Sequence, residues 1–441
     1  MAVSRSPSRT AGSHPKRLDI QVMRAAAVLL VVAYHLPGGW HLGGGFVGVD
    51  IFFAISGYVI TESILRSTSG ELQRVRFFFD FMRRRCRRLV PALSLAVAVA
   101  GVLILFVGPP DQARDGIHSA LASLFFVSNY WFLKHFDSYW NPLLAHNPLL
   151  HMWSLAVEFQ VYLAFPVIFI IVVRLLRDRE RSLQVRWLAF AVAACGAVSL
   201  ALFVYLLAFR TAPILQKAPS SLAFYTPMPR FWEFAAGAIV ALAAARGAGI
   251  ARNPSRLIKV AALAVATGSV IALGSADSVG LWVIPAIAAA AVLLAIPSDV
   301  EAGPRAIGFA GAVLVWVGDR SYSIYLWHWP FLALLVWRGA TQPLPIALAL
   351  LATLVVSDLS FRFVEQARWP QRTGFAGVAR ISRPLWGFGL ALVILVGGAV
   401  AIRYDVIIHT NSATSVATPF PPSQVDPTAA TLPMYDCGEM G

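Results

Sequence analysis

Residues 18–40 read LDIQVMRAAAVLLVVAYHLPGGW, an apolar run of membrane-spanning length that contains two ionisable residues, Arg24 and His35. Eleven positions separate them, about three turns of an α-helix, so both side chains lie on one helix face, about 16 Å apart. An ionisable group inside a bilayer is costly unless it faces protein or water, so the pair indicates a functional site. The alternative is an arginine that snorkels to the cytoplasmic interface and a histidine that is hydrogen-bonded within a helix bundle.

The composition of the chain is that of a polytopic membrane protein rather than a soluble domain. Of its 441 residues, 58% are hydrophobic and 13% are charged, and the mean hydropathy is +0.68. The formal net charge of +14 requires no nucleic-acid partner, because the basic residues are dispersed over loops that would face anionic lipid headgroups. We therefore expect the lipid bilayer, and no nucleic acid, among the partners of this chain.

Apolar runs of spanning length predict an all-α transmembrane bundle. Eleven candidate spans lie at 19–37, 46–65, 89–108, 149–173, 187–208, 230–245, 257–274, 280–297, 321–337, 344–361 and 385–403. Residues 117–133 are also apolar, but they contain His118, Asn129 and Tyr130, and we interpret them as an interfacial or re-entrant segment. With this count and a cytoplasmic N-terminus, most of the 36 lysine and arginine residues lie on the inner side and the C-terminus is extracytoplasmic.

The remaining segments have the composition of tails and linkers. Residues 1–17 are expected to form a disordered cytoplasmic tail, 371–384 a cytoplasmic linker, and 404–441 an extracytoplasmic linker rich in Thr, Ser, Ala and Pro. Three cysteines are too few for a disulfide scaffold, and no Cys/His spacing predicts a metal site. The G-x-S-x-G and H-E-x-x-H motifs are absent, which argues against a hydrolase or a metalloenzyme.

A glycine-rich segment, GGWHLGGGFVGVDIFFAISGYVIT (38–61), follows His35 at a short distance. Its first glycines predict a turn, after which the second span brings Asp50 back to the level of His35. A contact between the carboxylate and the imidazole, which would fix the tautomer of His35, is therefore expected. Ser56 lies further along the second span, and helix packing by small residues is the simpler explanation for it.

Five arginines precede the third span in FFFDFMRRRCRRLVPAL (77–93), which we interpret as an inner loop. Guanidinium groups form charge-assisted, forked contacts with phosphates, so the cluster suits a polyphosphate ligand. Membrane topology and lipid headgroup binding explain such a cluster equally well. No Walker A sequence is present, so ATP chemistry is not expected.

The fourth span begins with PLLHMWSLAVEFQVYLAFP (148–166), in which His151, Ser154 and Glu158 share nearly one helix face. A lone glutamate in a span should face a cavity or a basic partner. Trp153 is explained by anchoring in the aromatic belt at the membrane interface.

Two further spans contain ionisable residues. In PRFWEFAAGAIVA (229–241), Arg230 and Glu233 are interpreted as a structural ion pair. In GDRSYSIYLWHWPFLAL (318–334), His328 lies between two tryptophans, and taken alone it is interpreted as a packed, hydrogen-bonded histidine.

Taken together, these blocks resemble the membrane acyltransferase-3 family, of the O-antigen acetylase and peptidoglycan O-acetyltransferase type. The resemblance runs from Leu18 to about Glu365, and two departures from the family pattern, the opening IQVMR and Phe159, affect no residue assigned to chemistry. It rests on the Arg24–His35 spacing and on GGFVGVDIFFAISGYVIT (44–61), RRCRRLVPA (84–92), HMWSLAVEFQVY (151–162), RFWEFAAG (230–237), SYSIYLWHWP (321–330) and FVEQ (363–366).

The resemblance implies a ten-span core over 18–370 and an eleventh span in a bacterial cytoplasmic membrane. Such a protein moves an acyl group, acetyl by default and succinyl or another short acyl group as alternatives, from cytoplasmic acyl-CoA to a hydroxyl of an extracytoplasmic cell-envelope glycan. Acyl-CoA would be a co-substrate, and no cofactor would be bound permanently. The linker at 404–441 resembles that of fused members, so we expect an SGNH-type domain as a fused or separate partner.

Carried over residue by residue, the resemblance suggests roles for the blocks. Arg85, Arg88 and Arg24 would bind the phosphates of the donor. His35 would be the general base, oriented by Asp50, with Glu158 as a further catalytic residue. Supporting or acceptor-side residues would be Ser56, His151, Trp153, Tyr325 and His328.

Two other functions remain open at the level of sequence. A secondary transporter or lipid flippase also places charges near the midplane of the membrane, but its halves often repeat, and the Arg24–His35 pattern does not recur in this chain. A scaffold for envelope assembly would gain nothing from intramembrane histidine and glutamate residues, which are costly to bury.

Overall fold

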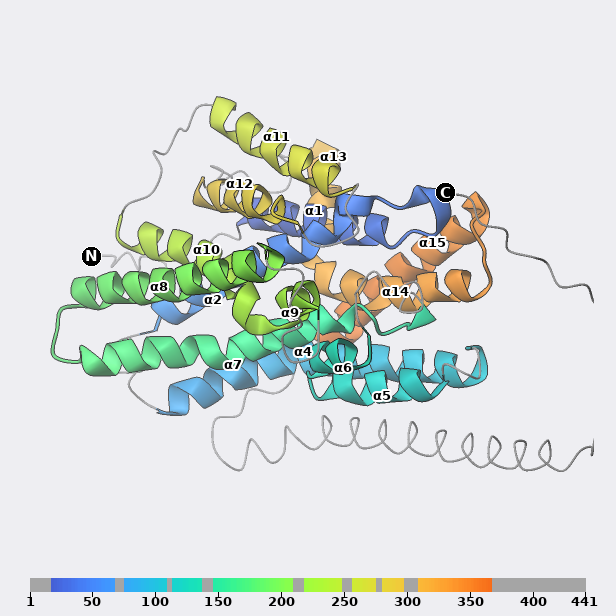
Figure 1. The fold of residues 1–441 in the computed structure, drawn as a ribbon, viewed down its shortest axis with the longest axis horizontal. Coiled ribbons are helices and arrows are strands. Elements are labelled where there is room, and N and C mark those ends of the chain that lie inside the picture. Colours follow the sequence, from blue (N-terminus) through green and yellow to red (C-terminus); the bar gives the residue numbers. More distant parts are fainter. Residues whose placement is uncertain are drawn as a thin grey trace, which may run out of the picture. The chain divides into compact units, whose positions relative to one another are not determined.

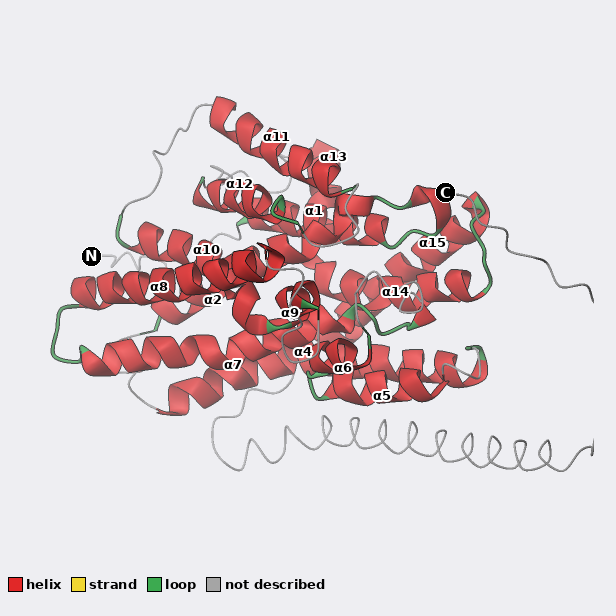
Figure 2. Cartoon of the chain, in the orientation of Figure 1, coloured by secondary structure: helices red, strands yellow, loops and turns green. Residues whose placement is uncertain are grey.

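The computed structural model describes residues 17–67, 75–108, 113–136, 146–208, 218–247, 256–274, 280–296 and 308–366. All of them belong to the first of two units into which the chain divides, Met1–Val396. Over these ranges the fold is all-α, as predicted, with no strand among them (Figure 2). The predicted eleventh span, most of the N-terminal tail and the linkers at 371–384 and 404–441 lie outside the described residues.

The helices follow one another along the chain with short connections (Figure 1). They are α1 (Leu18–Tyr34), α2 (Val47–Leu65), α4 (Val75–Phe106), α5 (Ala113–Leu124), α6 (Ser128–His135), α7 (Met152–Leu175), α8 (Arg181–Ala208), α9 (Pro219–Tyr225), α10 (Pro227–Ala245), α11 (Arg256–Leu273), α12 (Val283–Ala295), α13 (Gly308–Asp319), α14 (Ser321–Trp337) and α15 (Pro343–Ser360). Two 3-10 turns, η1 (Gly38–Trp40) and η2 (Gly43–Phe46), join α1 to α2, and a π-helical turn, η6 (Phe361–Glu365), ends α15.

Each of the ten predicted spans that fall in the described ranges coincides with a helix. Within those ranges, six helices are long and apolar enough to cross a membrane: α2 with η2, α4, α7, α8, α10 and α15 with η6. Three shorter apolar helices, α11, α12 and α13, accompany them. The chain is therefore a polytopic helical membrane protein. Helix α13 is one that the hydropathy pattern did not predict.

The segment 117–133 is not one spanning helix, as predicted. It is divided between α5 and α6, and Phe126, which lies between them, has a φ of 55°. Helices of 12 and 8 residues extend about 18 and 12 Å, which is less than the thickness of a hydrocarbon core.

The arginine cluster is helical, which corrects its interpretation as a loop. Helix α4 begins at Val75 and continues unbroken through the cluster to Phe106. Phe77, Phe81 and Leu89 repeat at helical spacing and are all buried, so this part of the helix has an apolar face. The guanidinium of Arg85 lies over the ring of Phe81, at 5.4 Å from its centroid, and continues that face.

Small residues allow α2 and α10 to approach closely. A Cβ atom on Gly57 would lie 1.9 Å from the carbonyl oxygen of Phe234, and one on Gly237 would lie 1.8 Å from that of Ala54. Neither position has room for a side chain. This crossing confirms the helix-packing interpretation of the small residues in the second span.

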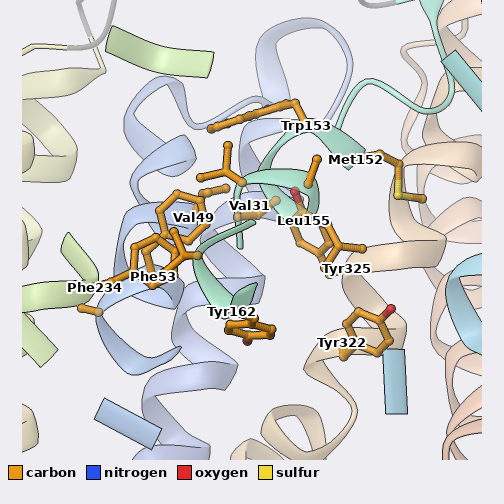
Figure 3. Close-up of a cluster of buried hydrophobic side chains, with 14 of the residues drawn as sticks. Val31, Val49, Phe53, Met152, Trp153, Leu155, Tyr162, Phe234, Tyr322 and Tyr325 are labelled. Atoms are coloured by element: carbon orange, nitrogen blue, oxygen red, sulfur yellow. The ribbon is translucent and has the colours of Figure 1, made fainter. Parts of the chain in front are cut away.

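The hydrophobic core lies where α2, α7, α10 and α14 meet (Figure 3). Phe53 of α2 stacks on Phe234 of α10, with ring centroids 4.5 Å apart. Tyr162, Tyr322 and Tyr325 belong to the same cluster and also border an internal cavity. The core therefore surrounds the space in which the candidate site is found.

Candidate active site

A cavity with about 800 Å³ of empty space lies between α1, α2, α4, α7 and α14. Its apolar walls come mainly from α2, with Phe52 and Phe53 among them. Of the predicted site residues, six line this cavity: Arg24, Ser56, Arg85, Arg88, Glu158 and Tyr325. Five helices that are far apart in the sequence thus bring together residues from five of the sequence blocks.

Three arginines give the cavity its positive charge. Arg24 projects from α1, and its Nε donates a hydrogen bond to the Ser321 hydroxyl at 3.0 Å. The guanidinium of Arg85 lies over two rings, those of Phe81 and Tyr162, at 5.4 and 5.3 Å from their centroids. Arg88 lines the cavity one helical turn beyond Arg85. Their mutual repulsion in a partly apolar space favours an anionic ligand that contacts several of them together.

Glu158 lies in the same cavity as these arginines. Its carboxylate accepts hydrogen bonds from Ser56 and Tyr162, in contacts between α2 and α7. We expected Glu158 beside the acceptor, near His151. Helix α7 instead places it two turns further along, about 10 Å deeper, on the side of the arginines. Tyr162 is four residues from Glu158, so the contact follows helical spacing, although we had not assigned Tyr162 to the site.

Three histidines from three distant segments form a cluster beside the cavity. His35 ends α1, His151 precedes α7, and His328 lies on α14. The ring centroids of His35 and His328 are 5.0 Å apart, and those of His151 and His328 are 5.2 Å apart. All three side chains are buried. The prediction that Arg24 and His35 share one face is confirmed, because both contact α14, at Ser321 and at His328.

The cluster meets the cavity at Tyr325 and Ser154. The Tyr325 hydroxyl donates to the backbone carbonyl of His151 at 2.6 Å and is 2.6 Å from the Ser154 hydroxyl. The Tyr325 ring lies 5.4 Å from the ring of His151 and 5.5 Å from that of His328, between centroids. Since Tyr325 and Ser154 also line the cavity, the arginines and the histidines are two parts of one site.

Hydrogen bonds to carbonyl oxygens determine the tautomers of two of these histidines. Nδ1 of His328 is 2.7 Å from the carbonyl oxygen of Tyr325, which can only accept, so Nδ1 carries the hydrogen. Nδ1 of His35 is 2.9 Å from the carbonyl oxygen of Val31 and is protonated for the same reason. In a neutral His35, the lone pair is therefore on Nε2.

Asp50 does not take the position that we expected for it. Its carboxylate pairs with Arg230 of α10, and Arg230 is also 3.3 Å from Glu233. The predicted ion pair between Arg230 and Glu233 is confirmed. The side chains of all three residues are 0 or 1% exposed. A charged guanidinium binds a buried carboxylate more strongly than a neutral imidazole does, and this explains why Asp50 pairs across α2 and α10 rather than with His35.

Trp153 surrounds this ion pair instead of lying in an aromatic belt. It is 2% exposed, and the guanidinium of Arg230 lies 5.8 Å from its ring. The rings of Phe53 and Phe224 lie at 5.6 Å from the same guanidinium. The aromatic rings offset part of the cost of burying the charge. Asp50 and Trp153 thus support the packing of the helices around the site and do not line the cavity.

The residues that the structure describes contain no group of three or more His, Cys, Asp or Glu side chains suited to a metal ion. The histidine cluster has its nitrogens directed to carbonyl oxygens and to one another, at the distances given above. Its chemistry is therefore that of proton transfer between neutral imidazoles.

Comparison with known proteins identifies a family over most of the chain. The family described as acyltransferase domain matches residues 17–362. The peptidoglycan O-acetyltransferase OatA of Listeria monocytogenes is 30% identical over 366 residues, which are 79% of this chain and 55% of the relative. The O-acetyltransferase OatA of Staphylococcus aureus is 29% identical over 414 residues, 89% of this chain and 64% of the relative. The chain thus spans less than two thirds of the length of these relatives. No solved structure matches it significantly.

Proposed function

The chain belongs to the acyltransferase-3 family, and from this membership and the geometry of the site we propose that it is a membrane O-acyltransferase. It would move an acyl group, acetyl by preference, from cytoplasmic acyl-CoA to a hydroxyl of an extracytoplasmic cell-envelope glycan. The observation that supports this most directly is that an arginine-lined cavity meets a histidine cluster at Tyr325 and Ser154.

The arginine part of the cavity suits the donor. Coenzyme A carries several phosphate groups at one end and a thioester at the other, joined by a slender arm. Arg24, Arg85 and Arg88 provide forked donors for phosphates, and the Ser321 contact and ring stacking hold two of them in place. The apolar wall around Phe52 and Phe53 would contact the arm. The thioester would then reach Tyr325 and the histidines.

The histidine part suits the transfer step. His35, whose Nε2 carries the lone pair, would remove the proton from the acceptor hydroxyl. The acceptor oxygen attacks the thioester carbonyl, the new ester bond forms, and the carbon–sulfur bond breaks with its electron pair going to sulfur. The proton held by His35 then neutralises the thiolate. This direct transfer needs no acyl-enzyme.

The acceptor and the setting follow from the relatives and from the charge pattern of the sequence. Because one relative is named a peptidoglycan O-acetyltransferase, peptidoglycan is the acceptor that we propose first. The N-terminus would lie in the cytoplasm of a bacterial cell and the glycan outside its inner membrane. The relatives are longer than this chain, and an SGNH-type domain, fused or separate, is the proposed partner that completes delivery.

The proposal is tested with the purified full chain in lipid nanodiscs, radiolabelled acetyl-CoA and soluble peptidoglycan strands. We expect label in the glycan and an ester that mild base removes. The matched control is His35→Ala, for which we expect the transfer rate to fall by about 10²–10⁴-fold, the usual contribution of a general base, while acetyl-CoA binding persists. A transporter, a flippase or a scaffold would leave the glycan unlabelled. Near-normal activity of His35→Ala would overturn the assignment of the base.

A further inference from the structure

The contacts of His328 show what orients the proposed base. Its own helix supplies two carbonyl oxygens to Nδ1, those of Tyr325 at 2.7 Å and Ile324 at 3.2 Å. Its Nε2 is 3.2 Å from Nδ1 of His35. Since Nδ1 of His328 carries the hydrogen, Nε2 has a lone pair and accepts from the Nδ1–H of His35.

The same hydrogen of His35 therefore lies between two acceptors, the Val31 carbonyl oxygen at 2.9 Å and Nε2 of His328 at 3.2 Å. The titratable groups whose rings face His328 are His35 from α1, His151 from the start of α7 and Tyr325 from α14 itself. His151 directs its Nε2 to the Leu326 carbonyl oxygen at 3.2 Å, so it too has its lone pair on Nδ1. No contact with a carboxylate or a guanidinium is found for His328 among the described residues.

We propose that His328 is the positioning residue of the transfer reaction: it accepts the Nδ1–H of His35, keeps the lone pair of His35 on Nε2, and shares the positive charge that forms on His35. This inference rests on the proposed function. In a Ser-His-Asp triad, a carboxylate performs this task on the opposite nitrogen of the base. Here the carboxylate that the sequence suggested for it, Asp50, is paired with Arg230.

The proton can be followed through the step. It leaves the acceptor hydroxyl as the acceptor oxygen bonds to the acyl carbon, and it arrives on Nε2 of His35. The resulting imidazolium binds Nε2 of His328 through Nδ1–H more strongly than the neutral ring does, because hydrogen bonds from a charged donor are stronger. When the carbon–sulfur bond breaks, the proton on Nε2 of His35 passes to the thiolate. His328 ends the cycle as it began, neutral, with Nδ1–H on its two carbonyl oxygens.

A neutral imidazole suits this task inside a membrane. A carboxylate at the same place would be a permanent charge in the bundle, and unpaired charges there are costly. An imidazole presents an acceptor nitrogen without a resting charge and becomes polarised only when His35 is protonated. The two carbonyl oxygens on Nδ1 then stabilise any positive charge that His328 shares.

The test compares His328→Gln and His328→Phe in the acetyl-transfer assay. The glutamine amide oxygen can accept the hydrogen bond of His35 but cannot take up a proton, whereas phenylalanine offers no acceptor. We expect kcat to fall about 10²-fold for His328→Phe and less for His328→Gln, with KM for acetyl-CoA within about twofold of the wild type in both.

The pH profile separates positioning from a structural role. Removing the acceptor disfavours the protonated form of His35, so the acid limb of the kcat profile should move to lower pH in His328→Phe. The expected shift is about one pH unit, the worth of one hydrogen bond to a charged group. The control is His135→Gln, an exposed histidine at the end of α6, for which neither kcat nor the limb should change.

The possible outcomes are distinct. If both His328 variants match the wild type in kcat and in the acid limb, the inference is wrong although the proposed function stands. If the wild type transfers no acyl group to a glycan, the proposed function fails before the variants are compared. Should His328→Phe not fold, His328→Gln decides: a lower kcat with unchanged KM supports the inference, and wild-type kcat overturns it.

Discussion

The residues of the site differ in how tightly their surroundings hold them. Arg85 is sandwiched between two rings, His35 and His328 have carbonyl oxygens within hydrogen-bonding distance of their Nδ1 atoms, and Glu158 accepts from two hydroxyls. Such contacts fix the side chains before any ligand binds. A preorganised site loses less entropy when the donor arrives and keeps the base correctly oriented for transfer.

Arg85 provides the prediction at the scale of the residue. Arg85→Ala should raise KM for acetyl-CoA about tenfold, because one charge-assisted contact with a phosphate is lost, and should leave kcat within about twofold. Arg85→Lys should recover little, since an ammonium neither stacks between two rings nor forms a forked contact.

The control for this prediction is Arg76→Ala on the same helix, where an exposed arginine pairs with Asp80 at 3.5 Å and does not line the cavity. Kinetics with acetyl-pantetheine, which lacks the phosphate-bearing end of the donor, give a second check. Arg85→Ala should use it as well as the wild type does. A selective loss with this short donor would show that Arg85 acts on something other than phosphate.

At the scale of the element, the crossing of α2 and α10 holds one wall of the cavity. Helix α2 contributes Phe52, Phe53 and Ser56 to that wall. Its position on α10 depends on two reciprocal glycine contacts and on the buried ion pair between Asp50 and Arg230. Van der Waals packing of small residues and polar contacts between helices are the main forces that join membrane helices. We therefore assign Asp50 to this crossing.

Gly237→Ala tests this crossing. The added Cβ would lie 1.8 Å from the carbonyl oxygen of Ala54, so α2 and α10 must separate, and we expect a destabilisation of about 1–3 kcal/mol, typical of overpacking. Gly268→Ala on α11 is the matched control, because its Cβ would meet nothing within 4 Å. There alanine should be neutral or slightly stabilising, by up to about 1 kcal/mol from helix propensity. Thermal unfolding of both variants in detergent measures the difference, and equal melting temperatures would contradict the prediction.

The whole molecule places the two parts of the site at different depths. Arg24 and Ser321 contact each other near the starts of α1 and α14, whereas His35 and His328 meet further along both helices. A donor bound at one depth can therefore meet an acceptor at another without either substrate crossing the protein. The proposed direction of transfer, from inside to outside, depends on this arrangement.

Sealed vesicles test the proposed direction. Acetyl-CoA does not cross bilayers unaided, so inverted membrane vesicles should use externally added acetyl-CoA at once. Right-side-out vesicles should become active only after they are permeabilised. The measurement is radiolabel in the glycan, with His35→Ala vesicles as the background. Immediate activity of right-side-out vesicles would place the donor site on the outer face and contradict the proposed topology.

Much of the architecture was predictable from sequence, and the reason is physical. A helix in a bilayer must satisfy its backbone hydrogen bonds within itself, so the lengths of apolar runs determine where helices form. The ten predicted spans in the described ranges match helices for this reason. The arginine segment and α13 escaped prediction, because charge in the first and short length in the second hid helices that packing stabilises.

The candidate site was predictable only in part. Periodicity placed Arg24 and His35 on one face, and helical spacing placed Glu158 on the same span as His151. Which residues meet across helices depends on side-chain packing between segments that are hundreds of residues apart, such as His35 and His328. Sequence proximity favoured Asp50 as the partner of His35, but a buried guanidinium from α10 competes more strongly for a carboxylate.

The sequence by itself determined the class of the protein, the positions of its helices and the residue types available for chemistry. Only the tertiary structure decided their partners: Glu158 beside the arginines, Asp50 with Arg230, and His328 against His35. Hydrophobicity is a property of each segment and can be read locally. A hydrogen bond between two helices depends on their relative position and rotation, which the packing of the whole bundle sets.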